Sequence, residues 1–595
     1  MSHYSNDANL DTSKIRKTVA IIGLTIFSVN LVLIPNRISG YRPSLYTHVP
    51  SMVYALGTIA IFISIVSYLL SSMIEEIDVG ITAFLPMYLQ LLILISMPWV
   101  LGYAIRSGDA MTHFGTLNSI TVTGQLPPDP GQIIYPSIHI MFSAVSVVSG
   151  MKPLSTFWIS SPVIAVIYLL FIFSLSRKGQ VDVQDCFLLL PFVIGARMLS
   201  RHPSAFAYTT LFLGILLLLY CHQKTFRVIA LVAILSIGIW LQHSFVPIYL
   251  IGVVVITRLL KRPVSAMQFR DDIGNLALLM ALTGSIWFMY AREGLFNKAV
   301  GLISYVFTGV YSAAGSAETA DPGGNVLVTI FDVLGYTALD FLLLVLRRFG
   351  SLFLIVSMAG FGLVIAYHQD ELGPIRDVTT VVYFSSIGLS IILFFVEIPV
   401  LTFTRILRPS LFLGVVPAAL FMGNLKNRFS EAGGALRSIQ AFLLIALLVT
   451  SLVGFSYAHH YNRPNEIDAN SYVTYSNLHK YGWMYEYVGI TDRVVSLNYQ
   501  PRRFADFLLP RSQTAVGRLP LAPPHFGYPE GLQAVMKSGY YIETKRGRLL
   551  HLKIGDTTEL NKGDYSKLNN DVAVSNIYHN GKNVIYRFNY DEHNS

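Results

Sequence analysis

Long apolar runs recur along this chain and decide what it can fold into. Runs of roughly 17–25 residues, separated by short polar or charged breaks, match the length that a helix needs to cross the hydrocarbon core of a membrane. With 53% hydrophobic and 13% charged residues, the chain is far more apolar than a soluble domain. The sequence therefore predicts a polytopic α-helical membrane protein.

We expect about thirteen membrane crossings from these runs. The polar segment 1–17, which precedes the first of them, is predicted to be a disordered cytoplasmic terminus. Lys and Arg concentrate in several of the inner loops that follow, as the positive-inside rule requires, and the large outer loops are then 106–155 and 292–349. The runs lie near residues 18–35, 51–73, 80–104, 156–174, 183–198, 206–222, 228–241, 244–260, 273–291, 350–367, 379–400, 409–423 and 438–457.

The segment "VLVTIFDVLGYTALDFLLLVLRRFG", residues 326–350, is apolar enough to be counted as another crossing. Counting it would move everything that follows to the opposite side of the membrane. Because it carries Asp332 and Asp340 and ends in Arg347–Arg348, we expect an amphipathic helix at the membrane interface, before a true crossing at 350–367.

The composition changes after His460, where no further run is long enough to span. We expect residues 458–595 to form a separate extracytoplasmic soluble domain of small α/β type. The stretches "RVVSLNY", "RLLHLKI" and "NVIYRFNY" read as strands, and "PEGLQAVMKSG" reads as a short helix that ends at Gly539. Asn580–Gly581 is a hairpin signal between strand-like residues.

Charge and cysteine usage exclude several classes. The formal net charge is +9, but Lys and Arg are scattered over loop ends rather than gathered in a stripe with aromatic residues, which favours membrane lipid over nucleic acid as the partner. Cys186 and Cys221 both lie in apolar runs, so neither a disulfide framework nor a thiolate metal site is expected.

Polar and ionisable residues recur at the predicted outer ends of the helices, where their convergence marks a candidate substrate site. Singly, each has a plain structural explanation: arginines at helix ends anchor to headgroups, His243 is explained equally well by packing, and Pro136 suits the first turn of a helix "PSIHIMFSAVSVV". His113 and His139 lack further ligands at metal-binding spacing; no cofactor is assigned, and a divalent cation is left open. The set is Arg106, Asp109, His113, Tyr135, His139, Arg197, Arg201, His202, Gln242, His243, Arg292, Glu293, Glu397, Arg405 and Arg408.

The order of an apolar helix, "SGDAMTH", about twenty polar residues, then "YPSIH" and "SG" resembles the first outer loop of GT-C fold glycosyltransferases. "ARMLSRHPSAFAYTTLFLGILLLLY" and "LQHSFVPIYLIGVVV" resemble the next outer turns. "FVEIPVLTFTRILRPSLFLGVVPAALF" is similar to the segment in which such enzymes carry an Arg near the lipid phosphate, and "VSNIYHNGKNVIYRF" is similar to their C-termini. The resemblance implies a GT-C-like membrane domain at 18–457 and a sugar donor linked to polyprenyl or dolichyl phosphate.

By this resemblance Asp109 matches the carboxylate of the first outer loop and is expected to act as the catalytic base. General base catalysis supplies roughly 10²–10⁴-fold. Arg405 is the expected phosphate clamp, with Arg408 as its competitor three residues on. The remaining expected substrate contacts are Arg106, His113, Tyr135, His139, Arg201, His202, His243 and Glu293.

The sequence departs from two related groups. The Asp–Glu pair of protein mannosyltransferases is Gly108–Asp109 here, and Glu293 or Glu397 is a candidate substitute for the missing carboxylate. The Trp-Trp-Asp motif of oligosaccharyltransferase catalytic subunits does not occur, which disfavours en bloc transfer of a glycan to asparagine.

We therefore expect an inverting transferase that moves one sugar to a glycan or protein acceptor on the outer face of the cell membrane. A surface-polysaccharide polymerase or ligase that uses a lipid-diphosphate glycan is the alternative enzyme. A transporter fits less well, because the ionisable residues lie at one end of the helices rather than at the centre of the bilayer.

Overall fold

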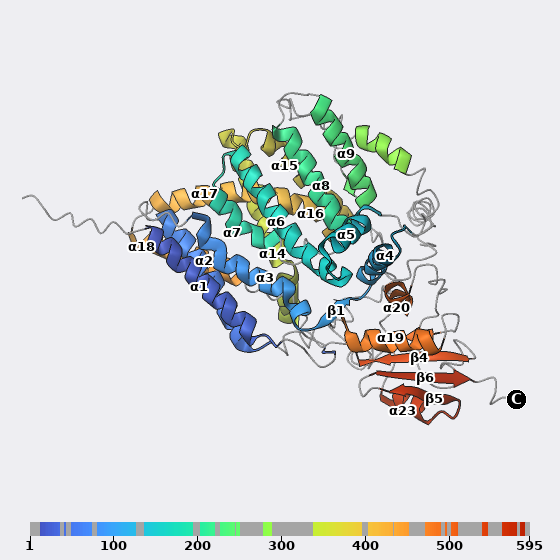
Figure 1. Cartoon of the computed structure of the whole chain (residues 1–595). Helices are drawn as coiled ribbons and strands as arrows, with labels where there is room; N and C mark the ends of the chain where they lie inside the picture. The colour runs from blue at the N-terminus through green and yellow to red at the C-terminus, as the bar shows by residue number, and fades with distance from the viewer. Residues whose placement is uncertain are drawn as a thin grey trace, which may run out of the picture.

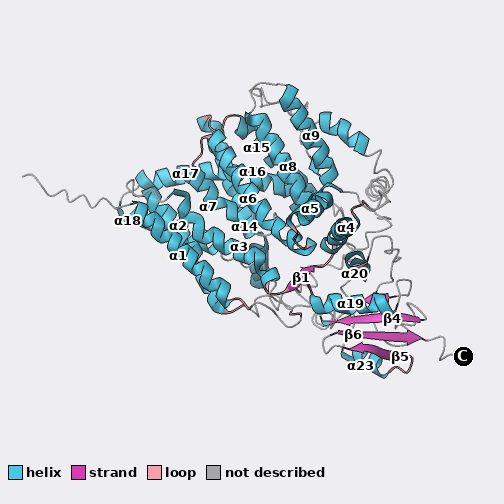
Figure 2. Ribbon diagram, in the orientation of Figure 1, coloured by secondary structure: helices cyan, strands magenta, loops and turns pink. Residues whose placement is uncertain are grey.

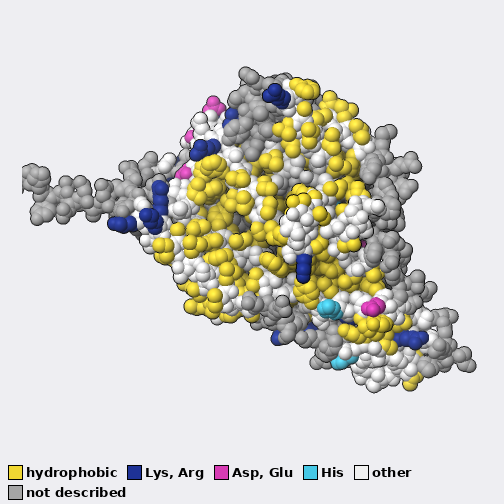
Figure 3. Space-filling model, in the orientation of Figure 1, with side chains coloured by type: hydrophobic (Ala, Val, Ile, Leu, Met, Phe, Trp, Pro, Cys, Tyr) yellow, Lys and Arg dark blue, Asp and Glu magenta, His cyan; other side chains and the backbone are white. Residues whose placement is uncertain are grey.

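The computed structural model describes residues 12–35, 41–42, 49–73, 80–126, 136–193, 203–220, 226–243, 246–249, 251, 278–287, 337–395, 403–431, 434–451, 470–488, 494–496, 501–509, 538–545, 562–579 and 583–589. It consists of a large helical bundle and a smaller C-terminal region that contains a sheet (Figures 1 and 2). Hydrophobic side chains cover much of the visible face of the bundle (Figure 3). The chain is a multi-pass helical membrane protein.

Six of the described helical segments are long and apolar enough to cross a membrane. Each coincides with a predicted run. The total of about thirteen crossings stays a prediction, because the run at 244–260 lies mostly, and the run at 273–291 partly, outside the described residues. The six are Ser13–Leu33, Ser51–Ser71, Gly80–Val100, Pro153–Gly179, Leu352–Gln369 and Pro409–Arg428.

The N-terminal helices α1 (Thr12–Leu33), α2 (Ser51–Met73) and α3 (Leu85–Val100) pack against one another, with the short 3-10 helix η2 (Gly80–Phe84) between the last two. Asn30 Nδ2 donates to Gln90 Oε1 at 2.9 Å, both residues being buried. A buried amide pair of this kind satisfies polar groups inside an apolar bundle and ties α1 to α3.

The expected outer loop 106–155 is largely helical: the sequence predicts the helix at Pro136, but not the helix at Asp109. It contains α4 (Asp109–Thr123) and α5 (Pro136–Ser149). Met111, Phe114 and Leu117 of α4 are buried at a spacing of three residues, so this polar-looking stretch carries a narrow apolar face. The predicted start of a helix at Pro136 is confirmed.

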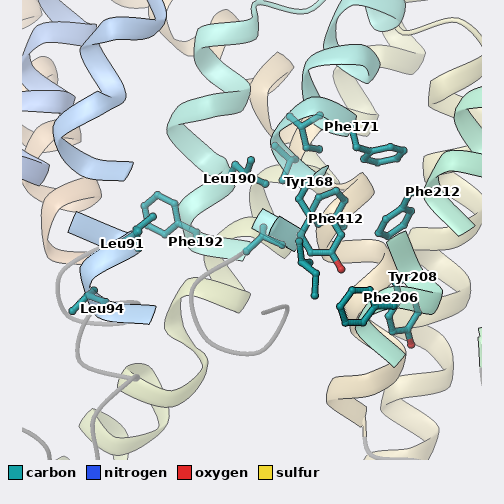
Figure 4. Close-up of a cluster of buried hydrophobic side chains, with 14 of the residues drawn as sticks. Leu91, Leu94, Tyr168, Phe171, Leu190, Phe192, Phe206, Tyr208, Phe212 and Phe412 are labelled. Carbon is teal, nitrogen blue, oxygen red and sulfur yellow. The ribbon is translucent and has the colours of Figure 1, made fainter. Parts of the chain in front are cut away.

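The middle of the bundle is formed by α6 (Pro153–Gly179), α7 (Val183–Val193), α8 (Pro203–Tyr220) and α9 (Phe226–Gln242). Aromatic rings fill the space between α6, α8 and α16 (Phe403–Leu413) (Figure 4). The Phe412 ring lies 4.4 Å from that of Tyr168 and stacks on that of Phe212 at 4.8 Å. Aromatic pairs at these distances bury large apolar areas in defined geometry.

The segment predicted as two helices that meet at residue 350 is a single helix, α14 (Ala338–Gln369). It starts at a capping box, in which Thr337 accepts from the backbone of Asp340 and the Asp340 side chain accepts from the backbone of Thr337. Hydrogen bonds within α14 therefore continue through Gly350. Residues 326–336 of this segment lie outside the described residues.

The C-terminal helices of the bundle are α15 (Pro374–Phe395), α17 (Val415–Glu431) and α18 (Gly434–Ser451). At the end of the bundle remote from α4, Lys426 of α17 lies 2.7 Å from a carboxylate oxygen of Asp185 in α7, and the Tyr68 hydroxyl of α2 donates to the same carboxylate. The ion pair neutralises a buried carboxylate, as groups at membrane depth require.

The C-terminal region contains β2 (Tyr472–Thr474), α19 (Tyr475–Tyr487), β3 (Val494–Ser496), α20 (Pro501–Leu508), β4 (Ser538–Thr544), α23 (Lys562–Asn570), β5 (Val574–His579) and β6 (Asn583–Asn589). Four strands form a sheet in the order β3-β4-β6-β5, with β3 and β4 parallel and the other pairs antiparallel.

Several predictions for this sheet are confirmed. β3 and β6 lie in two of the three predicted strands, and β5 and β6 pair on either side of the predicted Asn580–Gly581 turn. The third predicted strand, 548–554, lies outside the described residues. The expected helix end at Gly539 is wrong, because Gly539 belongs to β4, whose alternating side chains pair with β6 along its whole length.

A second, two-stranded sheet joins the C-terminal region to the bundle. β1 (Tyr103–Arg106), which follows α3, pairs antiparallel with β2. The indole of Trp158 in α6 donates to the Ala104 carbonyl at 2.9 Å and stacks on the ring of Tyr472. The region around β2 therefore packs against the end of the bundle (Figure 1).

Candidate active site

Asp109 lies at the start of α4, just beyond the end of the third apolar helix. The chain leaves α3, forms β1 and turns at Gly108, whose φ of 89° lies in the region that favours glycine. Gly108 supplies no side-chain cap, and a carboxylate in the first turn of a helix interacts favourably with the helix dipole. The Asp109 side chain is 50% exposed, so its carboxylate is accessible to a ligand.

Arg503 of α20 is the cation beside this carboxylate. Its Nη2 lies 2.8 Å from Asp109 Oδ1, and its Nη1 donates to the Thr112 hydroxyl oxygen at 2.6 Å. The Arg503 side chain is 18% exposed. One planar guanidinium group therefore contacts two residues that are one turn apart on α4.

α20 packs closely on α4 beneath this pair. The Thr112 hydroxyl donates to Asp506 Oδ2 at 2.7 Å, and Asp506 is buried. A Cβ on Gly115 would overlap the backbone carbonyl of Asp506, so the two helices approach as closely as a glycine allows. The rings of Phe114 and Phe507 stack at 4.6 Å.

The two histidines of this segment are brought together. Nδ1 of His113 in α4 lies 3.2 Å from Nε2 of His139 in α5, which is buried. Two imidazole nitrogens form a hydrogen bond only when one carries a proton and the other does not. One of these two nitrogens is therefore the donor and the other the acceptor. His113 lies one turn after Asp109 on α4.

Arg106 ends β1 and is exposed. Its Nε donates to the Ser471 hydroxyl at 3.2 Å, and the neighbouring backbone N–H of Ser107 donates to the Ser471 carbonyl at 2.8 Å. Arg106 thus contacts the segment that leads into β2. His243 lies at the end of α9, where its backbone N–H donates to Ile239.

Other predicted site residues are placed in part or not at all. Arg405 and Arg408 lie on α16, but their side chains are not among those described. α16 packs chiefly on α15, whereas α4 packs chiefly on α5, α6, α20 and β1. Their expected phosphate contact stays a prediction. The predicted residues outside the described ranges are Tyr135, Arg197, Arg201, His202, Arg292, Glu293 and Glu397.

The site residues predicted from the sequence do not include Arg503, Thr112 or Asp506. A signal was present in "PRRFADF", where Pro501 suits the first position of a helix. In this stretch Phe504 and Phe507 are three residues apart, and so are Arg503 and Asp506. At helical spacing this gives α20 one apolar face and one charged face. Sequence spacing does not reveal that this face meets Asp109.

No metal centre is found in the described part of the chain, where no three His, Cys, Asp or Glu side chains gather in a way that suits an ion.

No family model and no curated protein matches the chain. Eight chains of solved structures do. One is ArnT from Cupriavidus metallidurans in the apo state, with a TM-score of 0.41, 10% identity, and coverage of 83% of this chain and 96% of that one. Another is ArnT from the same organism bound to undecaprenyl phosphate, with a TM-score of 0.34, 10% identity, and coverage of 85% and 98%.

Both TM-scores lie below 0.5, and assignments of residues in this chain therefore depend on its own geometry.

Proposed function

We propose that this protein is a membrane glycosyltransferase that transfers a sugar from a polyprenyl- or dolichyl-phosphate carrier to a glycan or protein acceptor on the outer face of the membrane. One observation carries the proposal: a half-exposed carboxylate, Asp109, held at 2.8 Å by Arg503 at the junction between the apolar bundle and the C-terminal region.

The reaction that fits this arrangement is an in-line displacement at the anomeric carbon. An acceptor hydroxyl oxygen forms the new bond to that carbon, the bond to the carrier phosphate breaks, and the phosphate leaves with the electron pair. The acceptor proton passes to Asp109. Because phosphate is a good leaving group, a base for the acceptor and cations for the phosphate are the main requirements, and displacement from the opposite face inverts the anomeric carbon.

Arg503 suits a role beside the base. A neighbouring positive charge favours the ionised carboxylate, which is the form that accepts a proton. For the carrier phosphate we keep Arg405 as the proposed clamp and Arg408 as its competitor, since a guanidinium group can hold two phosphate oxygens.

The remaining proposed substrate contacts lie on segments that surround or follow α4. His113 and His139 are already paired beside it, and Arg106 lies three residues before Asp109. Further proposed contacts are Tyr135, Arg201, His202, His243 and Glu293.

Strand pairing supports a site and a C-terminal region on the same side of the membrane, which is the outer side if the N-terminus is cytoplasmic as expected. The pairing of β1 with β2 requires both strands to lie on one side of the membrane, so an even number of crossings separates them, as the predicted runs satisfy. The Tyr41 hydroxyl donates to the carbonyl of Asn470 at 2.8 Å, which brings the segment after α1 to the same side. We accordingly propose that residues 458–595 are extracytoplasmic and assist acceptor recognition.

The test is a deletion strain complemented with the wild-type chain, with Asp109→Asn or with Asp370→Asn, followed by mass spectrometry of surface glycans. Deletion should remove one defined sugar, and Asp109→Asn should fail to restore it, because an amide cannot take the acceptor proton. Asp370 is the matched control: it is an exposed carboxylate that pairs with Arg376 at the other end of the bundle, so its variant should restore the sugar. A wild-type glycan profile with Asp109→Asn would contradict the role of Asp109.

A further inference from the structure

We infer that Arg503 is a positioning residue for Asp109, so that the C-terminal region sets the geometry of the base. The inference rests on the proposed function and adds a residue and a region that the sequence motifs do not assign to the site. Its basis is the fork of contacts from Arg503 to two residues on α4, at 2.8 Å to Asp109 and at 2.6 Å to Thr112.

Asp109 gains a defined side-chain direction from such a partner. It begins α4 after a glycine that makes no side-chain cap, and half of its side chain is exposed. An exposed side chain samples several staggered rotamers. Arg503 contacts Asp109 through Nη2, and its plane is fixed by the second contact to Thr112, so it selects the rotamer in which Asp109 Oδ1 faces the guanidinium group.

The position of Arg503 is in turn fixed by hydrogen bonds that involve Thr112 and Asp506. The Thr112 hydroxyl that accepts from Arg503 also donates to the buried carboxylate of Asp506. One turn of α20 separates Arg503 from Asp506, so both side chains contact the same face of α4. The four side chains form one continuous hydrogen-bonded chain from Asp506 through Thr112 and Arg503 to Asp109.

The alternative explanation is that the Arg503–Asp109 pair merely fastens α20 to α4. The packing argues against this. Gly115 already lets the Asp506 backbone approach α4 closely, and Phe114 stacks on Phe507. A half-exposed ion pair adds little to such an interface, so the docking of α20 does not require it.

The electrostatic consequence gives a distinctive readout. A cation beside a carboxylate favours the ionised form, so removing it makes protonation easier and moves the acid limb of activity to higher pH. The other titratable and charged groups on α4 and on the elements packed around it also act on Asp109, and they are unchanged in an Arg503 variant. They are Arg106 of β1, His113 of α4, His139 of α5, Lys152 before α6, and Arg502 and Asp506 of α20; Arg177 and Lys178 lie at the far end of α6.

The experiment adds the purified full-length chain to detergent-solubilised membranes of the deletion strain, which contain donor and unmodified acceptor. Transfer is followed by mass spectrometry as a function of pH for wild type, Arg503→Gln, Arg503→Lys and Thr112→Val, with Arg376→Gln as the control. Thermal unfolding of each protein is measured alongside.

Arg503→Gln should lower the rate on the order of 10²-fold, the cost of a misplaced catalytic group, and should move the acid limb to higher pH. Arg503→Lys should restore the acid limb, because the charge returns, but only part of the rate, because an ammonium group cannot span both partners. Thr112→Val should lower the rate without moving the acid limb. Arg376→Gln should match wild type.

Two outcomes would overturn the inference alone: wild-type rate and pH profile in Arg503→Gln, or equal losses in the Gln and Lys variants with an unchanged profile and a lowered unfolding temperature. If the wild-type chain itself transfers no sugar, the proposed function fails, and the role of Arg503 fails with it.

Discussion

At the scale of single residues, Asp109 and Lys480 are charged side chains in opposite environments. Asp109 is half exposed and lies 2.8 Å from a guanidinium group. Lys480 of α19 is fully buried, and no hydrogen-bond partner for its Nζ is found in the described part of the chain. An accessible, paired charge suits chemistry, whereas a buried, unpaired one costs stability.

Burial lowers the pKa of Lys480 well below its ordinary value, although the negative charge of Glu543 partly opposes the shift. Between that lowered pKa and the ordinary lysine value of about 10.4, the unfolded chain binds a proton that the folded chain does not. Stability should therefore fall as pH falls through this window.

Replacing Lys480 with methionine should remove this penalty. We expect Lys480→Met to raise the unfolding temperature of the full-length protein, with a larger gain at pH 7 than at pH 10. Thermal unfolding at both pH values measures the effect, and Lys567→Met is the control, because Lys567 of α23 is exposed. A loss of stability in Lys480→Met at both pH values would show that an ionised Lys480 is accommodated.

At the scale of elements, the contact between α4 and α20 builds the candidate site. α4 carries Asp109 and Thr112, and α20 carries Arg503 and Asp506. Their closest approach is at Gly115, where the Asp506 backbone occupies the space that a side chain would need. A glycine in a helix interior is otherwise unfavourable, so its presence is explained by this contact.

Enlarging Gly115 should separate the two helices. We expect Gly115→Ala to cost about 1–3 kcal/mol, as overpacking does, and to reduce sugar transfer by drawing Arg503 away from Asp109. Gly238→Ala in α9 is the control: a Cβ there meets no atom within 4 Å, so stability should be unchanged or slightly raised. Unfolding temperature and transfer rate measure both variants, and a wild-type rate in Gly115→Ala would argue against the dependence of the site on this contact.

At the scale of the whole molecule, segments far apart in the sequence meet at one end of the bundle. Residues 41–42, 103–106 and 470–474 are joined there by hydrogen bonds and strand pairing. α6 begins near this end, where Trp158 contacts Ala104, and finishes at Gly179, which lies against Leu372. The start of α15 therefore lies at the opposite end.

This arrangement predicts which positions share a side of the membrane. In a background without Cys186 and Cys221, Gln125→Cys and Ser575→Cys should react with an impermeant thiol reagent in intact cells. Asp370→Cys should react only after permeabilisation, because it lies beside the opposite end of α6. Labelling of Gln125→Cys and Ser575→Cys from different sides would contradict the topology.

The class of the molecule and many of its elements follow from local sequence patterns. Apolar runs long enough to span a membrane predict helices because no other element satisfies its own backbone within the hydrocarbon. The six described helical segments that could span coincide with such runs. Local signals likewise located the start of α5 at Pro136 and the β5–β6 hairpin, because proline geometry and turn chemistry act over a few residues.

Which residues meet is known only from the folded chain. It placed Arg503 beside Asp109, although 393 residues separate them, and it paired His113 with His139. It also merged the two helices expected around residue 350 into α14. These features depend on packing between distant segments. The sequence of one segment does not indicate which other segment will form hydrogen bonds with its polar side chains.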